Sequence, residues 1–210
     1  MRKESMKQAW RLLLLVLLLG YVRAADRHAP GELPACCQEL KPDLAYTDRS
    51  LYQLESLWTS DLGKTIRLGV FHGRPQVVAM FFAHCEYACP IIVHDMKAIE
   101  ARLPDDLRDR VGFLLITFDS ERDTVEVLHE YRMRHKLPVT NWTLLRAKPD
   151  DALELAALLG VKYKRDLRGQ FAHSNLITVL NAEGEIAHQQ VGLNQDPVQM
   201  VGAIQRLFEP

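Results

Sequence analysis

Cys85 and Cys89 are the residues of this chain whose type and spacing most clearly suggest chemistry. They stand four positions apart within residues 81–90, FFAHCEYACP, after an apolar run and at the start of a helical pattern. Residues i and i+4 share one helix face, so two sulfur atoms at this spacing can converge on one point. The first turn of a helix also stabilises thiolate, the form that binds metal and attacks disulfides. The spacing therefore predicts a soft-metal site, a redox couple, or both.

A metal held by two thiolates in an open site needs a further ligand, and a borderline or soft metal accepts imidazole. Of the eight histidines, His173 is the best candidate, because it ends a Gly- and charge-rich segment just before a predicted strand. His84 adjoins Cys85 but should point the other way from an extended backbone. His94 lies five positions beyond Cys89, which rotates it off the cysteine face.

The elements that must position these residues alternate between strands and helices. Short apolar runs predict buried strands, and apolar residues at helical spacing predict helices. Predicted strands cover residues 77–82, 111–118, 142–145, 176–180 and 185–191, and predicted helices cover 89–103, 124–135, 150–159 and 197–208. Asp150 or Asp151 is the expected cap of the third helix, and Gly160 is its expected end.

This order predicts an α/β fold of the thioredoxin type, with a central mixed sheet flanked by helices. The strand that leads into the cysteines and the strand after His173 belong to one sheet in such a layout. We therefore expect the loop that ends at His173 to lie beside the cysteine turn. An extra β-hairpin is predicted between Ser50 and Phe71, with a turn at residues 61–64 and a strand over 65–70.

The N-terminus resembles a secretory signal. Basic residues precede an 11-residue apolar run, Leu12 to Val22, and small residues follow at a cleavage position before Ala25. A membrane span needs about 20 apolar residues, so cleavage is the preferred reading and a short uncleaved anchor is the alternative. We predict a signal peptide at 1–24, an extended lead-in at 25–49 and one domain at 50–210. The protein would be exported, to the periplasm or the outer face of the cytoplasmic membrane.

Charge and cysteine content exclude two broad classes. The net charge of −1 argues against a general nucleic-acid binder. Only four cysteines are present, all among the first 90 residues, which is too few and too uneven for a disulfide-held scaffold. Cys36 and Cys37 lie outside the predicted domain, and their role stays open between metal binding, pairing with another chain and no function.

Several segments together resemble the Sco/SenC family, the copper-binding assembly factors of cytochrome c oxidase. Residues 82–90, FAHCEYACP, resemble the family's Cys-x-x-x-Cys-Pro motif. Residues 117–124, TFDSERDT, resemble the segment after the second central strand, usually Asp-Pro-x-Arg-Asp-Thr. Residues 159–163 and the His173–Ser174 pair, followed by the strand and turn of 179–185, also agree. The resemblance covers about residues 50–208.

The resemblance implies that Cys85, Cys89 and His173 are copper ligands and that Asp119 is a nearby acidic residue that supports them. Two thiolates and one imidazole suit Cu(I), and a fourth weak ligand would make Cu(II) tolerable. The two thiols could instead close into a disulfide, which excludes metal binding. Two positions depart from the pattern. Ala172 replaces the Asp that often precedes the histidine, which puts a carboxylate partner for that imidazole in doubt, and Ser120 replaces Pro.

The predicted function is therefore that of a copper metallochaperone, a carrier rather than an enzyme. The family implies delivery of copper, with reducing equivalents as a second cargo, to cytochrome c oxidase subunit II or another extracytoplasmic copper client. A thiol reductant would be a second partner. The main alternative is an extracytoplasmic thiol–disulfide oxidoreductase without obligatory metal. That class usually carries Cys-x-x-Cys and needs no His173. A copper sensor or scaffold is a third reading.

Overall fold

A seven-stranded mixed sheet forms the centre of the described part of the protein. The structure is a computed structural model that describes residues 46–167 and 170–209. The strands lie in the order β2-β1-β5-β4-β3-β8-β9. The parallel core consists of β3 (Gln76–Phe81), β4 (Gly112–Thr117) and β5 (Trp142–Arg146). Antiparallel to β3 runs β8 (Leu176–Leu180), and β9 (Ile186–Val191) pairs with β8. This arrangement confirms the predicted central mixed sheet.

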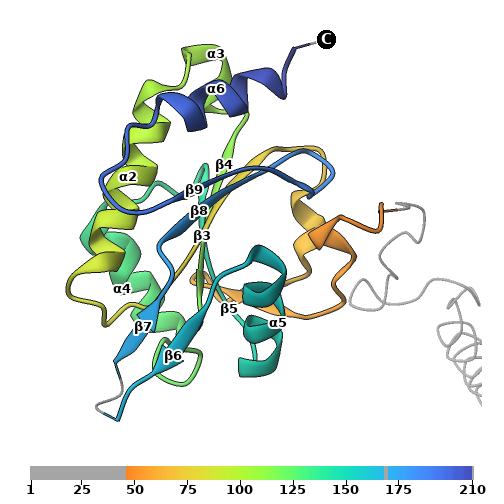
Figure 1. Cartoon of the computed structure of the whole chain (residues 1–210). Coiled ribbons are helices and arrows are strands. Elements are labelled where there is room, and N and C mark those ends of the chain that lie inside the picture. Colours follow the sequence, from red (N-terminus) through yellow and green to blue (C-terminus); the bar gives the residue numbers. More distant parts are fainter. Residues whose placement is uncertain (1–45, 168–169, 210) are drawn as a thin grey trace, which may run out of the picture. The chain divides into compact units, whose positions relative to one another are not determined.

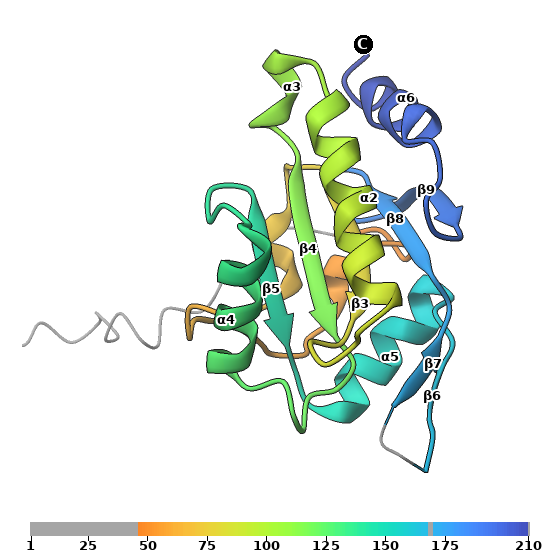
Figure 2. The same cartoon turned by 90° about the vertical axis from the view of Figure 1, so that its left-hand side faces the viewer.

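Helices cover both faces of this sheet (Figures 1 and 2). On one face lie α2 (Ala88–Arg102) and α4 (Val125–His135), and α5 (Pro149–Leu159) covers the other. The last helix, α6 (Val198–Arg206), packs against α2 and β9, and a single turn, α3 (Asp105–Arg108), precedes β4. Every residue of β3 and β4 is buried, which explains why both strands read as continuous apolar runs.

The predicted N-terminal hairpin is present, but its second strand is shorter than expected. Here β1 (Trp58–Ser60) pairs with β2 (Thr65–Ile66), and β1 joins the sheet antiparallel to β5. Beyond Ile66 the chain forms a 3-10 helix at Leu68–Phe71, so the predicted strand over 65–70 is wrong in its second half. Leu68 is the buried residue of that turn.

Two helix starts also differ from the sequence prediction. Lys148 occupies the N-cap of α5 without a side-chain hydrogen bond, so Asp150 and Asp151 lie in the first turn and do not cap it. Their negative charges still favour the positive end of the helix dipole. The last helix was predicted to begin at residue 197, but Pro197 is the N-cap and α6 begins at Val198, whose N–H donates to Asp196 Oδ1 at 3.1 Å.

The segment before the last strands is a second small sheet rather than a loop. In it, β6 (Tyr163–Arg165) pairs antiparallel with β7 (Phe171–His173). His173 therefore ends a strand, which corrects the prediction of a Gly- and charge-rich loop. The β6–β7 hairpin projects past the end of the main sheet at which β3 hands over to α2 (Figure 2). This places the hairpin beside the segment that carries the cysteines.

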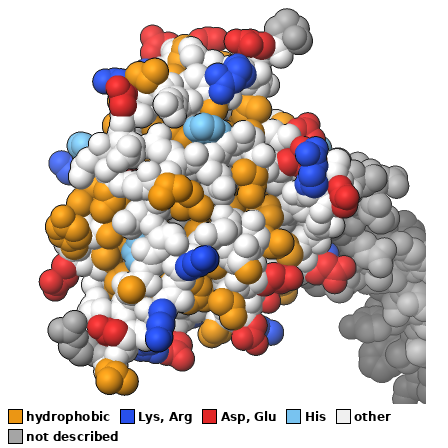
Figure 3. Space-filling view, in the orientation of Figure 1, with side chains coloured by type: hydrophobic (Ala, Val, Ile, Leu, Met, Phe, Trp, Pro, Cys, Tyr) orange, Lys and Arg blue, Asp and Glu red, His pale blue; other side chains and the backbone are white. Residues whose placement is uncertain are grey.

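The predicted signal peptide and most of the lead-in lie outside the described residues. Within the described residues, no helix is both long and apolar enough to cross a membrane. Figure 3 shows basic and acidic side chains interspersed on the face in view, with hydrophobic side chains gathered between them. Neither sign of charge therefore dominates this face.

Candidate metal and thiol site

Cys85 lies in the turn between β3 and α2, and Cys89 lies in the first turn of α2. The helix begins at Ala88, so the two cysteines do not share a helix face as the sequence suggested. Instead the Cys85 N–H donates to the Phe82 carbonyl at 3.2 Å, and the chain folds back on itself. The Cys89 N–H then donates to Cys85 Sγ at 3.3 Å. The sulfur thus accepts one of the backbone N–H groups that every helix start leaves unpaired.

The two thiols differ in exposure and in charge. Cys89 is fully buried, Cys85 is half-buried, and both are free thiols. A hydrogen bond from the Cys89 side chain lowers the pKa of Cys85 to about 3, and His173 contributes in the same direction. That hydrogen bond, together with burial, raises the pKa of Cys89. The pair therefore holds one proton and one negative charge near neutral pH, with the thiolate on the accessible sulfur.

His173 completes a group of three donor atoms. Its Nε2 lies 3.7 Å from Cys89 Sγ, and the donor atoms of Cys85, Cys89 and His173 all lie within 4.8 Å of one another. Its Nδ1 lies 3.0 Å from the Ser174 carbonyl oxygen. Because a carbonyl only accepts, Nδ1 carries a proton, and Nε2 is the ring nitrogen that faces the sulfurs. The backbone carbonyl thus orients a ring that has Ala172, and no acidic residue, before it.

Aromatic side chains hold the histidine hairpin in place. The ring of His173 packs 5.2 Å from that of Phe118 and 6.1 Å from that of Phe82, between centroids. Phe171 lies 5.0 Å from Phe118 and 5.2 Å from Phe82. Tyr163 of β6 stacks on Phe118 at 4.7 Å. Since Phe82 and Phe118 follow β3 and β4, this cluster joins the hairpin to the end of the main sheet.

An open cleft is lined by two of the three donor residues, Cys85 and His173, whereas Cys89 is fully buried. The cysteine turn forms one wall, and strand β7 with its flanking residues forms the other. Its lining includes Phe82, Cys85, Glu86, Tyr87, Phe171 and His173. Tyr87 is 76 % exposed, so an aromatic side chain stands open to solvent at the rim of this cleft.

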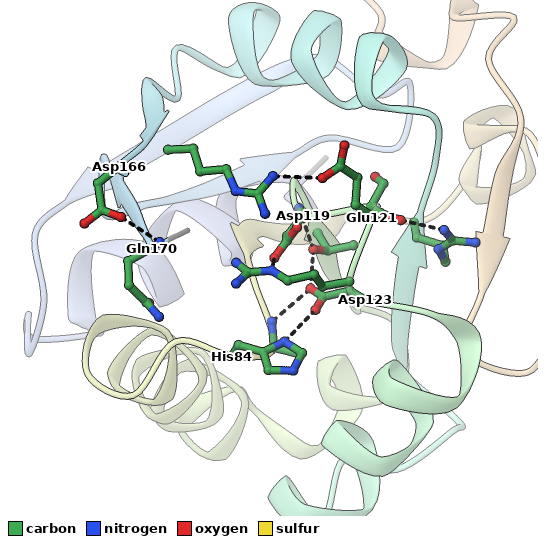
Figure 4. A network of polar contacts seen from close by, with 12 residues as sticks. His84, Asp119, Glu121, Asp123, Asp166 and Gln170 are labelled. Atoms are coloured by element: carbon green, nitrogen blue, oxygen red, sulfur yellow. Dashed lines mark hydrogen bonds and ion pairs between the residues drawn. The ribbon is translucent and has the colours of Figure 1, made fainter. Parts of the chain in front are cut away.

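Asp119 is near this site but does not touch the three donors. It follows β4, is buried, and forms an ion pair with Arg122 (Figure 4). Its backbone N–H donates to Thr117 Oγ1 at 3.0 Å. With Arg122 as its partner, Asp119 lies outside the set of convergent donors, and a supporting role remains a proposal.

The sequence did not reveal the role of Asp123, which is fully buried beside the cysteine turn. Its carboxylate contacts the backbone N–H of Ala83 and the ring of His84 (Figure 4). Its partners Ala83 and His84 lie 40 and 39 positions away, and contacts over that distance left no signal in the sequence. His84 faces this carboxylate and solvent, as its predicted direction away from the sulfurs requires.

The donor set is chemically suited to a soft metal ion. It combines a thiolate, a buried thiol that can exchange its proton for a metal ion, and an imidazole whose Nε2 faces the sulfurs. Two sulfurs and one nitrogen are ligands that Cu(I) prefers, and hard cations prefer oxygen. The residues present therefore fit copper better than calcium or magnesium.

A mixed sheet with a cysteine pair at the start of its first long helix defines a thioredoxin-like protein, and the added histidine hairpin defines a thiol and metal site on it. The family described as SCO1/SenC matches residues 51–209. This match covers most of the chain, which therefore belongs to the SCO1/SenC family.

Individual relatives are distant in sequence but similar in fold. A protein from Stutzerimonas stutzeri, named as copper-binding, is 23 % identical over 159 residues, covering 73 % of this chain and 76 % of the relative. The copper-bound crystal structure of Arabidopsis thaliana ScoI aligns with a TM-score of 0.64 and 21 % identity, over 72 % and 96 % of the two chains. BsSco, described as a Sco protein with a disulfide switch, aligns with a TM-score of 0.63 and 18 % identity, over 74 % and 93 %. These alignments confirm the fold.

Proposed function

We propose that this protein is an exported copper metallochaperone that holds Cu(I) through Cys85, Cys89 and His173. The observation that carries the proposal is the convergence of these three donor atoms within 4.8 Å, although His173 stands 84 positions from Cys89 in the sequence. The copper-binding relative and the copper-bound Sco structure support the choice of metal.

Each of the three residues has a distinct part in this function. Cys85 is the accessible thiolate at the cleft, so an incoming partner meets it first. Cys89 is buried and keeps its proton until a metal or a disulfide replaces it. His173 supplies a neutral ligand that leaves without changing its charge. An ion held by two sulfurs and one nitrogen can pass to the thiols of a client by stepwise exchange of ligands, since Cu(I) tolerates low coordination numbers.

The client and the location belong to the same proposal. Membership of the family supports a role in cytochrome c oxidase assembly, and BsSco is described as belonging to that group of assembly proteins. We propose copper delivery to subunit II as the specific role. We also propose that residues 1–24 direct export and that Asp119 supports the site by fixing Arg122 near Phe171.

A thiol–disulfide oxidoreductase is the second candidate, and the split pKa values of the two thiols favour it. The Cys85 thiolate would attack one sulfur of a client disulfide and release the other as a thiolate. Cys89 would then lose its proton, attack Cys85 and release the reduced client. The protein is left with a Cys85–Cys89 disulfide and needs a thiol reductant to return. Copper cannot bind in that state, so the two activities exclude each other at any moment.

Titration with Cu(I) and a competing chelator tests the proposal. The full chain with Cys36→Ser and Cys37→Ser removes the other thiols and serves as the reference. We expect one Cu(I) per reduced reference protein, none in the Cys89→Ala variant, and weaker binding in the His173→Ala variant. The His173→Ala protein should still form its disulfide in a redox buffer. Near-stoichiometric Cu(I) in the Cys89→Ala protein, or unchanged binding in His173→Ala, would contradict the proposal, and a reference protein that binds no Cu(I) would favour the oxidoreductase.

A further inference from the structure

Asp123 places a fully buried carboxylate directly behind the cysteine turn. Its Oδ2 accepts the Ala83 N–H at 2.9 Å and the Thr117 hydroxyl at 2.5 Å. Its Oδ1 faces His84 Nδ1 at 3.3 Å. One oxygen therefore contacts Ala83 and the other contacts His84, the two residues that precede Cys85 (Figure 4). Thr117 links the carboxylate to the end of β4. Burial raises the pKa of this carboxyl group, which shows that the position is costly for a charge.

The start of α4 does not explain why a carboxylate is buried here. Thr124 is the N-cap of that helix, and its hydroxyl oxygen accepts the Val127 N–H at 3.3 Å. The cap is therefore complete without Asp123. The oxygen atoms of Asp123 turn the other way, toward the segment between β3 and α2.

A second metal site is not the explanation either. Oxygen and nitrogen atoms of His84, Asp119 and Asp123 do lie within 4.8 Å of one another. However, the guanidinium of Arg122 already pairs with Asp119, and the oxygens of Asp123 already accept from a backbone N–H and a hydroxyl. The network is thus occupied by protein donors.

We propose that Asp123 is a positioning residue for Cys85, which it holds in place through the backbone of Ala83 and the ring of His84. This inference rests on the proposed function only in taking Cys85 as the reacting group. Two bonds define the turn. One runs from Ala83 N–H to Asp123, and the other runs from Cys85 N–H to the Phe82 carbonyl. Together they fix the backbone from which the Cys85 sulfur accepts the Cys89 N–H.

The role predicted for Asp123 is that of a hydrogen-bond acceptor rather than of a charge. Asparagine retains an oxygen that can accept from Ala83 and Thr117, and its amide group can donate to His84 Nδ1 once that ring adopts the tautomer with its proton on Nε2. Leucine has a similar volume but no acceptor. Asp123→Leu should therefore release the turn, and Asp123→Asn should preserve it.

The reduction potential of the Cys85–Cys89 couple in the metal-free protein is the test. It is measured in the full chain with Cys36→Ser and Cys37→Ser by equilibration with thiol–disulfide buffers. Loss of the turn removes hydrogen bonds that stabilise the thiolate, so Asp123→Leu should favour the disulfide about tenfold, which lowers the potential by about 30 mV. In Asp123→Asn the thiol–disulfide equilibrium constant should stay within threefold of the reference.

Asp95→Leu is the matched control. Asp95 is also a buried carboxylate that accepts one backbone N–H, from Asn194 at 2.8 Å, but this bond ties α2 to the segment before α6. Thermal unfolding of each variant reports the general loss of stability. We expect Asp95→Leu to lower stability and to leave the thiol–disulfide equilibrium constant within twofold of the reference. Equal shifts in Asp95→Leu and Asp123→Leu, or an Asp123→Asn shift as large as that of Asp123→Leu, would overturn the proposal.

A further variant covers the case in which Asp123→Leu does not fold. Thr117→Val removes one of the two donors to Asp123 Oδ2 and keeps the shape of a strand residue. It should move the potential in the same direction by a smaller factor, and no shift would overturn the proposal. Failure of the reference protein to bind Cu(I) would refute the proposed copper function, and the effect of Asp123 on the thiol couple would still be measured.

Discussion

The two halves of the candidate site are supported by different kinds of interaction. The cysteine turn rests on directed hydrogen bonds to a buried carboxylate, and those bonds fix the backbone before Cys85. The histidine hairpin rests on aromatic packing, in which Phe171 and Tyr163 lie against Phe118. Hydrogen bonds fix direction over a few tenths of an ångström, and ring contacts retain most of their energy when a ring slides.

Thiol–disulfide chemistry and copper binding depend on these two halves to different degrees. The thiol couple depends mainly on the cysteine turn and the start of α2, because both sulfurs and the N–H that links them lie there, and His173 makes a smaller contribution to the low pKa of Cys85. Copper binding needs the turn and the hairpin at their present separation. Damage to the turn should therefore affect both activities strongly, and damage to the hairpin should affect copper binding far more than the thiol couple.

The largest expected effect concerns the reactivity of the turn. The pKa of Cys85 near 3 keeps it a thiolate throughout the range from pH 5 to 8. Alkylation of the reduced, metal-free chain carrying Cys36→Ser and Cys37→Ser should therefore proceed at a constant rate over that range. An ordinary thiol with a pKa of about 8.5 loses roughly a thousandfold in thiolate over these three units. A rate that falls tenfold per unit would show that the turn does not stabilise the thiolate.

The same shift predicts the sign of a stability change with pH. The folded pKa of Cys85 lies below its unfolded value, so its contribution to the free energy of unfolding is fully present above about pH 9, where the unfolded thiol ionises. It should decline steadily as the pH falls toward 3. Comparison with Cys85→Ser by denaturant unfolding isolates this contribution. A stability gap between the two proteins that widens toward low pH would contradict the assignment.

Phe171→Ala should loosen the packing of the histidine hairpin. Phe171 is partly buried and contacts both Phe82 and Phe118, so its truncation should cost about 2 kcal/mol, less than the ~3–5 kcal/mol of a fully buried ring. Cu(I) affinity should fall about tenfold, because His173 would no longer be held in its orientation. The thiol–disulfide equilibrium constant should stay within twofold of the reference. A change in that constant as large as the loss of copper affinity would show that the hairpin supports the thiol couple as much as it supports copper binding.

A change at the outer surface of the hairpin should have the smallest effect. Arg165 forms an exposed ion pair with Glu121 at 2.8 Å, and its guanidinium lies 5.7 Å from the Phe171 ring. Exposed pairs and cation–π contacts of this kind contribute about 0.5–1 kcal/mol. Arg165→Gln should change the unfolding free energy by no more than this and leave copper affinity unchanged. A tenfold loss of affinity would mean that charge, rather than ring packing, holds the hairpin.

The sequence was sufficient where burial leaves a periodic signal. Strands β3 and β4 appear as apolar runs because both faces are covered, and Gly160 ends α5 in a left-handed conformation as expected. The cysteine pair and His173 were found because their residue types are rare and chemically specific. Membership of the SCO1/SenC family confirms the resemblance that those segments indicated.

The sequence was insufficient where contacts are long in range or elements are short. Strands β6 and β7 have three residues each and carry charges, so neither shows an alternating pattern. Cys85 had the spacing of a helix face, but the helix begins three residues later. Asp123 and Ala83 are 40 positions apart, and only the folded chain shows that they form a hydrogen bond and that Thr124 caps α4.

X-ray absorption at the copper edge tests the central claim most directly. The full chain with Cys36→Ser and Cys37→Ser, reduced and loaded with one Cu(I), should show two sulfur ligands and one imidazole nitrogen. The imidazole signal should disappear in His173→Ala and persist in His84→Ala, whose ring faces Asp123 instead. An imidazole signal that survives in His173→Ala, or a reference spectrum with sulfur ligands alone, would contradict the assignment of the three donors to one site.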